Sequence, residues 1–71
     1  MGEYEKAIAD FNQALELNPE FANAYYGRGF TCRKTGQVEQ AVTDFERFLQ
    51  LSSDPYWREQ AEQHLRELRG D

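Results

Sequence analysis

The sequence has few of the residues that cross-link a small chain or bind metal: its 71 residues include one cysteine and one histidine. Because a disulfide needs two cysteines, no internal disulfide can form, and we expect a reduced, cytoplasmic location. Cys32 and His64 lie far apart in the sequence and have no paired ligands beside them. We therefore predict no structural metal site and no cofactor.

Long apolar runs are also missing. No stretch reaches the roughly 20 apolar residues that a membrane-spanning helix needs, and the acidic, helix-like N-terminus predicts no signal peptide. Basic residues are outnumbered, because 8 Lys and Arg stand against 13 Asp and Glu, and the net charge is −5. This charge argues against nucleic acid as a partner. The length predicts a single small domain, residues 1–71.

An internal repeat appears when the sequence is shifted against itself by 34 residues. Seven pairs are then identical: Gly2 and Gly36, Glu5 and Glu39, Ala7 and Ala41, Asp10 and Asp44, Phe11 and Phe45, Leu15 and Leu49, Leu17 and Leu51. No gap is needed to align these pairs. A fixed period in this range is typical of proteins built from stacked repeats.

Turn signals divide the chain into four predicted helices. Asn18-Pro19 ends the first, because the residue before a proline is pushed out of the helical region, and Gly36 can cap the second in a left-handed conformation. Asp54 and Pro55 are typical of a helix start. The predicted helices cover residues 3–18, 22–35, 37–51 and 55–69. Their short connections favour antiparallel neighbours, so the predicted fold class is all-α, built of antiparallel helical hairpins.

Short motifs at this period resemble the tetratricopeptide repeat family. The motifs in this chain are Tyr25-x2-Arg28-Gly29-x2-Cys32, Ala41-x3-Phe45 and Ala7-x3-Phe11. The family pattern is W-x2-L-G-x2-Y in the first helix of a repeat and A-x3-F in the second, followed by a proline. That proline is present as Pro19, whereas its counterpart in the second copy is Ser53 and Pro55 follows two residues later.

The resemblance covers residues 2–55 and implies a solenoid segment of about one and a half repeats with a capping helix. Residues 2–21 would form the second helix of a partial repeat. Residues 22–55 would form a full repeat, and residues 56–71 would be the C-terminal capping helix and tail. The resemblance implies a non-catalytic module, and the carboxylates of the sequence include no pair marked as acid and base.

The family pattern implies packing roles for Tyr25 and Cys32, which share one side of the second helix. Gly29 and Ala41 would let two helix backbones approach closely beside Phe45. Cys32 is then a small buried apolar residue, with a reactive thiol as the lesser reading.

Arg28 departs from the family pattern, because it replaces an apolar residue. We hypothesise that it pairs with Asp44 of the same repeat or with Asp10 of the preceding helix. Trp57 is expected to seal the last hairpin, with an interface anchor as the alternative. His64 lies among Gln, Glu and Arg and is expected at the solvated surface.

The first predicted helix matches the second helix of a repeat, and the sequence has no first helix to pair with it. Its apolar face would otherwise meet water, and such faces drive association. The sequence therefore predicts a homo-oligomer, with helices exchanged between chains as one form of it. The predicted self-association residues are Tyr4, Ala7, Ile8 and Phe11.

The other side of the second helix is the candidate partner site. In the family, first helices line a concave groove that binds peptides or helices of other proteins. The residues implied for this groove are Asn23, Tyr26, Phe30, Arg33 and Lys34. The segment 22–35 has three basic residues and no acidic one, which favours an acidic protein or peptide as the partner.

Four other interpretations are open for this stripe or for the chain as a whole. The stripe could simply cover the surface, and the whole chain could be a purely structural capping piece of a longer array. A nucleic-acid surface is disfavoured by the net charge. A nucleotide loop at Gly27-Arg28-Gly29 would need a preceding strand and a third glycine, and both are missing. The sequence thus predicts a protein-interaction module that binds a peptide or helix and self-associates.

Overall fold

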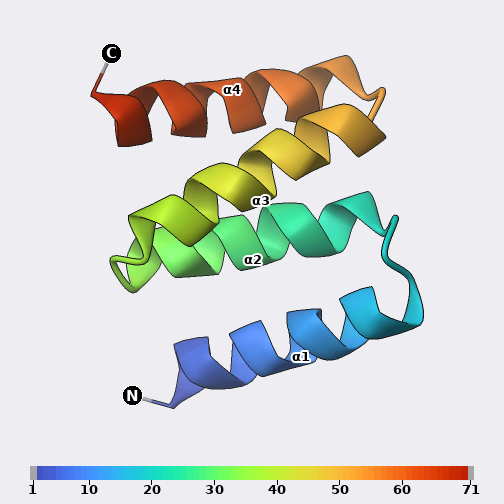
Figure 1. Ribbon diagram of the computed structural model, residues 1–71. Coiled ribbons are helices and arrows are strands. Elements are labelled where there is room, and N and C mark those ends of the chain that lie inside the picture. Colours follow the sequence, from blue (N-terminus) through green and yellow to red (C-terminus); the bar gives the residue numbers. More distant parts are fainter. Residues whose placement is uncertain (1, 71) are drawn as a thin grey trace.

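The computed structural model describes residues 2–70 and shows four α-helices joined by short turns. The helices are α1 (Glu3–Leu17), α2 (Ala22–Lys34), α3 (Val38–Leu51) and α4 (Pro55–Arg69). No strand occurs within residues 2–70. The predicted all-α class of helical hairpins is confirmed (Figure 1).

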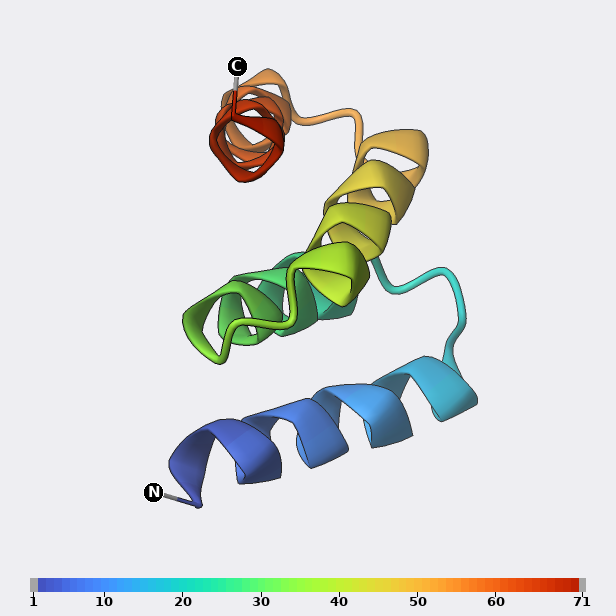
Figure 2. The same ribbon diagram turned by 60° about the vertical axis from the view of Figure 1, so that its left-hand side comes forward.

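The helices stack in chain order, and each packs against the next (Figure 1). Neighbours run antiparallel, as their short connections require. The stack also twists: in Figure 2, α4 is seen nearly end-on while α1 runs across the view. The two ends of the chain therefore lie at opposite ends of a short superhelical segment.

The turn signals in the sequence end the helices close to where they were predicted. α1 ends at Leu17, because Asn18 is extended (φ −146°, ψ 92°) before Pro19. After α2, Gly36 has φ +81°, a left-handed conformation that favours glycine. This residue lets the chain reverse into α3.

Polar side chains fix the start of α4. The carboxylate of Asp54 accepts a hydrogen bond from the backbone N–H of Tyr56 at 3.0 Å, as an N-cap does. Arg58, one turn into α4, donates to the backbone carbonyls of Leu49 and Ser52 at the end of α3. Arg58 thereby satisfies carbonyl groups that the end of α3 leaves free, a role that the sequence did not reveal.

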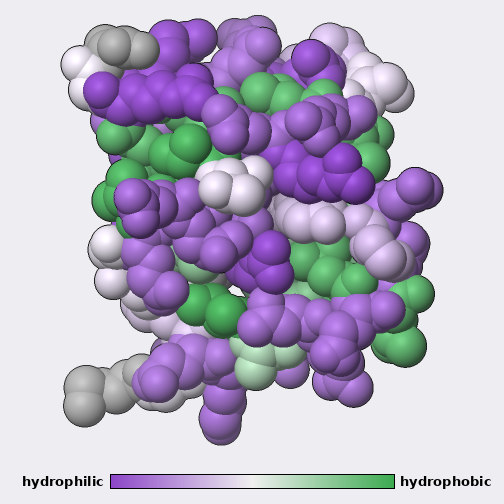
Figure 3. Space-filling view, in the orientation of Figure 1, coloured by the Kyte–Doolittle hydropathy of each residue, from purple (hydrophilic) through white to green (hydrophobic). Residues whose placement is uncertain are grey.

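The core lies along α3, which has helices on two sides. Its buried cluster is Cys32, Ala41, Phe45, Phe48, Ala61 and Leu65. Figure 3 shows one face of the molecule, where hydrophobic side chains appear between the helices and hydrophilic ones cover most of the rest. Within residues 2–70, no helix combines the length and the hydrophobicity that crossing a bilayer requires.

A buried ion pair joins α2 to α3. Arg28 donates from Nε to Oδ2 of Asp44 at 2.9 Å and from Nη2 to Oδ1 at 2.8 Å. Its Nη1 donates to Oδ1 of Asn12 in α1 at 2.8 Å. The structure therefore contains the hypothesised pair with Asp44, whereas the contact to α1 goes to Asn12 and not to Asp10. The hydrogen bonds to Asp44 raise the pKa of Arg28, and burial opposes them.

Gly29 lies where α2 meets α3. A Cβ atom at this position would be 3.2 Å from Cβ of Asp44 and 3.3 Å from two ring carbons of Phe45. Both neighbours are fully buried and have no room to move away. The missing side chain therefore sets the separation of the two helices.

We predict that Arg28→Leu destabilises the fold. Asp44 is 0 % exposed, so removing its partner leaves a buried carboxylate without a counter-charge. The expected loss in unfolding free energy is about 3 kcal/mol, measured by urea denaturation followed by circular dichroism.

Asp44→Ala supplies the control for this prediction. Added to Arg28→Leu, it should recover part of the lost stability, because it removes the unpaired charge. An Arg28→Leu variant as stable as the original chain would contradict the ion-pair interpretation.

Candidate functional site

The five residues predicted for the groove separate into two groups along α2. Asn23 and Tyr26 line a pocket near the start of the helix. Phe30, Arg33 and Lys34 lie beyond it, towards the C-terminal end. The structure therefore divides the predicted stripe into an apolar site and a basic end.

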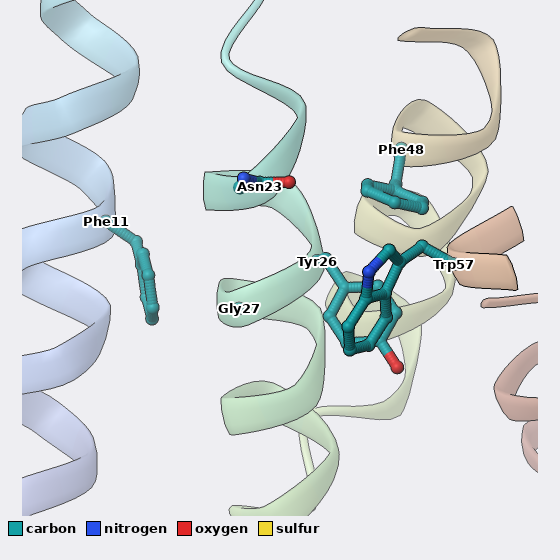
Figure 4. A pocket seen from close by; sticks show the side chains of 6 residues that line it. All are labelled: Phe11, Asn23, Tyr26, Gly27, Phe48 and Trp57. Carbon is teal, nitrogen blue, oxygen red and sulfur yellow. The ribbon is translucent and has the colours of Figure 1, made fainter. Parts of the chain in front are cut away.

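The pocket has a volume of about 310 Å³, and all four helices contribute to it. Its lining residues are Phe11, Asn23, Tyr26, Gly27, Phe48 and Trp57. Figure 4 shows Phe11 on one side of α2 and the rings of Tyr26, Phe48 and Trp57 on the other. None of the six side chains is charged, so the pocket is suited to an uncharged, apolar group.

Gly27 brings α1 and α2 close together at this site. A Cβ atom at Gly27 would collide with the ring of Phe11. Phe11 is thus half-buried against α2, whereas the sequence analysis expected its face to stand in water. The role of Gly27 was not predicted from the sequence, although the small residue Ala61 stands 34 positions later and is fully buried.

Tyr26 is held inside an aromatic cluster and does not simply point outward. Its ring meets those of Phe45, Phe48 and Trp57 edge-on, with centroids 5.4, 5.1 and 5.4 Å apart. Burial, with a smaller electrostatic contribution from the neighbouring phenol of Tyr56, raises the pKa of Tyr26. The phenol therefore stays neutral and forms part of an aromatic wall.

Trp57 stands at the rim of the pocket. Its side chain is 45 % exposed, so it does not seal the last hairpin as a buried core residue, which was the first expectation. It packs between Tyr26 and Tyr56, with centroid distances of 5.4 and 5.0 Å. The alternative reading, an exposed aromatic that can contact a partner, agrees with this position.

The basic end of α2 is partly used inside the chain. Arg33 forms an ion pair with Glu67 of α4 at 2.7 Å and donates from Nη1 to Nδ1 of His64 at 2.6 Å. The hydrogen bond from Arg33 lowers the pKa of Glu67. Lys34 is exposed and lies 5.3 Å from the ring centroid of Phe30, which is 42 % exposed. Lys34 and Phe30 thus remain available to a ligand.

His64 is not the solvated surface residue that the sequence analysis expected. Its ring stacks on Phe45 with a centroid distance of 4.6 Å and an interplanar angle of 4°, and it meets Tyr26 and Phe30 edge-on. Burial first, and then the charge of Arg33, lower the pKa of His64. Because a guanidinium can only donate, Nδ1 must accept, and the ring is neutral with its proton on Nε2.

Apart from Trp57, the residues predicted to pack inside the chain are buried or half-buried, and those predicted for self-association on α1 differ in exposure. Cys32, Ala41 and Phe45 are buried, and burial raises the pKa of the Cys32 thiol. Tyr25 is half-buried and donates from its hydroxyl to the backbone carbonyl of Pro19 at 2.9 Å. On α1, Ala7 and Ile8 are half-buried, while Tyr4 is 49 % exposed. In the part of the chain that the structure describes, no three His, Cys, Asp or Glu side chains gather as metal ligands.

We predict that acidification weakens the fold through His64. The unfolded chain takes up the proton first, since the folded-state pKa lies below the unfolded value. His64 therefore contributes its full stability above about pH 6.5. This contribution is lost as the pH falls from there towards the lower folded-state pKa, with a slope of at most about 1.4 kcal/mol per pH unit.

His64→Phe is the matched control, because it keeps an aromatic ring on Phe45 and removes the titrating group. The chain has one histidine, so the variant should lose most of the slope between pH 7 and 5 in urea denaturation. An unchanged slope would show that other groups cause it.

Comparison with known proteins gives two family matches that together cover residues 1–55. A model described as "TPR repeat" matches residues 1–32, and one described as "Tetratricopeptide repeat" matches residues 22–55. The second match has the same bounds as the full repeat that the resemblance implied. No solved structure matches the chain at a significant level.

Curated relatives share the same segment. Photosystem I assembly protein Ycf3 of Acaryochloris marina is 38 % identical over 60 residues, covering 80 % of this chain and 36 % of the relative. Anaphase-promoting complex subunit 3 of Schizosaccharomyces pombe is 38 % identical over 50 residues, 70 % of this chain and 8 % of the relative. Tetratricopeptide repeat protein 36 of Bos taurus is 43 % identical over 51 residues, covering 72 % of this chain and 27 % of the relative.

The chain thus spans 36 % or less of the length of these relatives. Helical hairpins that repeat every 34 residues, with the Ala-x3-Phe motif in both copies, agree with the two family matches. On this combined basis, the chain belongs to the tetratricopeptide repeat family, whose members are protein-interaction modules.

Proposed function

We propose that the chain is a non-catalytic module that binds a peptide or helix of another protein along α2. The observation that carries this proposal is the uncharged pocket to which all four helices contribute. Gly27 and Phe11 line one part of it, and Tyr26 and Trp57 form an aromatic wall. Such a site suits an apolar side chain of a partner, which would act as the anchor.

The basic residues at the C-terminal end of α2 favour a partner that also carries an acidic group. Lys34 is exposed, and Arg33 is already paired with Glu67, so Lys34 is the better placed of the two bases. From Tyr26 to Lys34 the helix rises by about 12 Å. An extended peptide covers that distance in about four residues. The proposed ligand therefore has an acidic residue about four positions from its apolar anchor.

The names of two relatives favour a protein as the partner. One is named for the assembly of photosystem I, and another is a subunit of the anaphase-promoting complex. We also propose a cytoplasmic location, because the single cysteine is free and buried. The alternative function is a purely structural capping piece, for which the pocket would have no ligand.

The chain carries its own reporter for the pocket, because its single tryptophan is Trp57. Peptides selected from a random 12-residue display library should change the emission of Trp57 on binding. With fluorescein-labelled peptide, Trp57→Ala should weaken binding at least about tenfold, since losing an aromatic anchor costs ~2 kcal/mol. Lys34→Glu should weaken the binding of peptides that carry the acidic residue.

Phe21→Ala is the control. Phe21 is an aromatic residue of similar exposure (42 %) and does not line the pocket, so its loss should change affinity less than about twofold. Selected peptides that bind Trp57→Ala as tightly as the original chain would overturn the pocket proposal. If repeated selection yields no binder, the purely structural function is favoured.

Association through the outer face of α1 is the second function that we propose. Tyr4 is 49 % exposed and Ala7 is half-buried, whereas Ile8, also half-buried, packs against the core. Phe11 lies next to this face, with its ring against Gly27 of α2. A second copy of the chain is the first partner to test.

Sedimentation equilibrium measures this association directly. The apparent mass of the original chain should rise with concentration, and Tyr4→Asp should lower it towards that of one chain, because a charge enters the contact. Leu17→Asp is the control at an exposed site near the end of the same helix (82 % exposed) and should leave the mass unchanged. One constant monomer mass at millimolar concentration would rule out self-association.

A further inference from the structure

We infer that an acidic partner binds the C-terminal end of α2 more tightly as the pH falls, because His64 changes there from an acceptor that holds Arg33 into an additional cation. This inference rests on the proposed function and adds the regulation of the same site. Three observations carry it: the groups that surround His64, the hydrogen bond that His64 accepts from Arg33, and a small polar hollow beside His64.

His64 borders both parts of the proposed ligand site. Its ring is stacked on Phe45 of α3 with a centroid distance of 4.6 Å. From α2, Tyr26 of the apolar pocket and Phe30 of the basic end meet the ring edge-on, at 5.7 and 5.8 Å. The phenol of Tyr26 is neutral, since burial raises its pKa. A change of charge on His64 therefore acts beside the groups that a ligand would contact.

The charged groups that act on His64 come from α2 and α4, whereas α3 meets it with the uncharged ring of Phe45. Arg33 and Lys34 are positive, and Glu67 is negative. The hydrogen bond from Arg33 lowers the pKa of Glu67, so this carboxylate stays charged in mild acid. The two bases and the acid leave one net positive charge, and a proton on His64 doubles it.

The hydrogen bond between Arg33 and His64 cannot persist once His64 is protonated. In the neutral ring, Nδ1 accepts from Nη1 of Arg33 at 2.6 Å. A protonated imidazole has no acceptor left, and two cations would then face each other. Arg33 must therefore turn away from the ring. Nη1 of Arg33 and Nδ1 of His64 can then each donate to a ligand carboxylate, in charge-assisted hydrogen bonds.

A hollow beside His64 offers space for such a carboxylate. Its volume is about 110 Å³, and its lining residues are Gln60, Gln63, His64 and Glu67. Near neutral pH, the charge of Glu67 repels an acidic group from the hollow, and the exposed Lys34 is the base that remains. A proton on His64 offsets the charge of Glu67, so the hollow becomes suited to an acidic group.

Two matched peptides test this inference. One is a display-selected binder whose acidic residue is aspartate, which stays mostly ionised at about pH 5. The other carries asparagine in its place. With a tetramethylrhodamine label and fluorescence anisotropy, the aspartate peptide should bind roughly threefold or more tightly at about pH 5 than at about pH 7.5, the gain of one added ion pair. The asparagine peptide should show no gain, and it controls for unfolding, because loss of folded chain weakens both peptides alike.

His64→Phe is the matched control in the chain, because it keeps a ring on Phe45 and cannot take up a proton. The gain of the aspartate peptide in acid should disappear in this variant. Nuclear magnetic resonance of the single histidine gives a second measurement. The aspartate peptide should raise the pKa of His64, since a bound carboxylate favours the charged ring, and the asparagine peptide should not.

The outcomes separate this inference from the proposed function. An aspartate peptide that binds equally at both pH values, or that keeps its gain in His64→Phe, overturns the inference and leaves the proposed function in place. If no peptide binds at either pH, the proposed function fails and the inference falls with it.

Discussion

The contact on which the rest of the structure depends is the pair of Arg28 and Asp44. Arg28 reaches α3 through Asp44 and α1 through Asn12, so one guanidinium ties three helices together. Asp44 is fully buried, and its charge is tolerated because both carboxylate oxygens are hydrogen-bonded. These contacts hold α2 against both of its neighbours. Tyr26 and Gly27, on the same helix, line the pocket.

Two glycines make α2 narrow enough for this arrangement. Gly29 lies against Asp44 and Phe45 of α3, and Gly27 lies against Phe11 of α1. Each glycine costs up to about 1 kcal/mol of helix stability relative to alanine. The cost is offset by close packing on both sides of α2, where side chains of α1 and α3 fill the space. Gly27 and the ring of Phe11, which meet between α2 and α1, both line the pocket.

The sequence was sufficient to predict what depends on local chemistry and on the period. Asn18-Pro19, Gly36 and Asp54 mark helix ends through backbone conformation and capping, which act within a few residues. The 34-residue period gave two candidate partners for Arg28, Asp44 and Asp10, because both copies hold an aspartate there, and the structure contains the pair with Asp44. The stacking of His64 on Phe45 depends on how α3 and α4 cross, and no spacing within one helix reveals it. The exposure of Trp57 likewise depends on how α3 and α4 cross, so it could not be predicted from spacing within α4.

Phe11 connects the two surfaces of the chain. One side of its ring lies over Gly27 and lines the pocket, and the same helix carries Asp10 on the outer face. A helix docked on α1 would restrict the motion of Phe11, and a ligand in the pocket would restrict the same ring. When two ligands order the same side chain, the binding of either one reduces the entropy cost of binding the other. Such coupling is reciprocal. On the two proposals for the pocket and for α1, the affinity of the pocket would therefore depend on what covers α1.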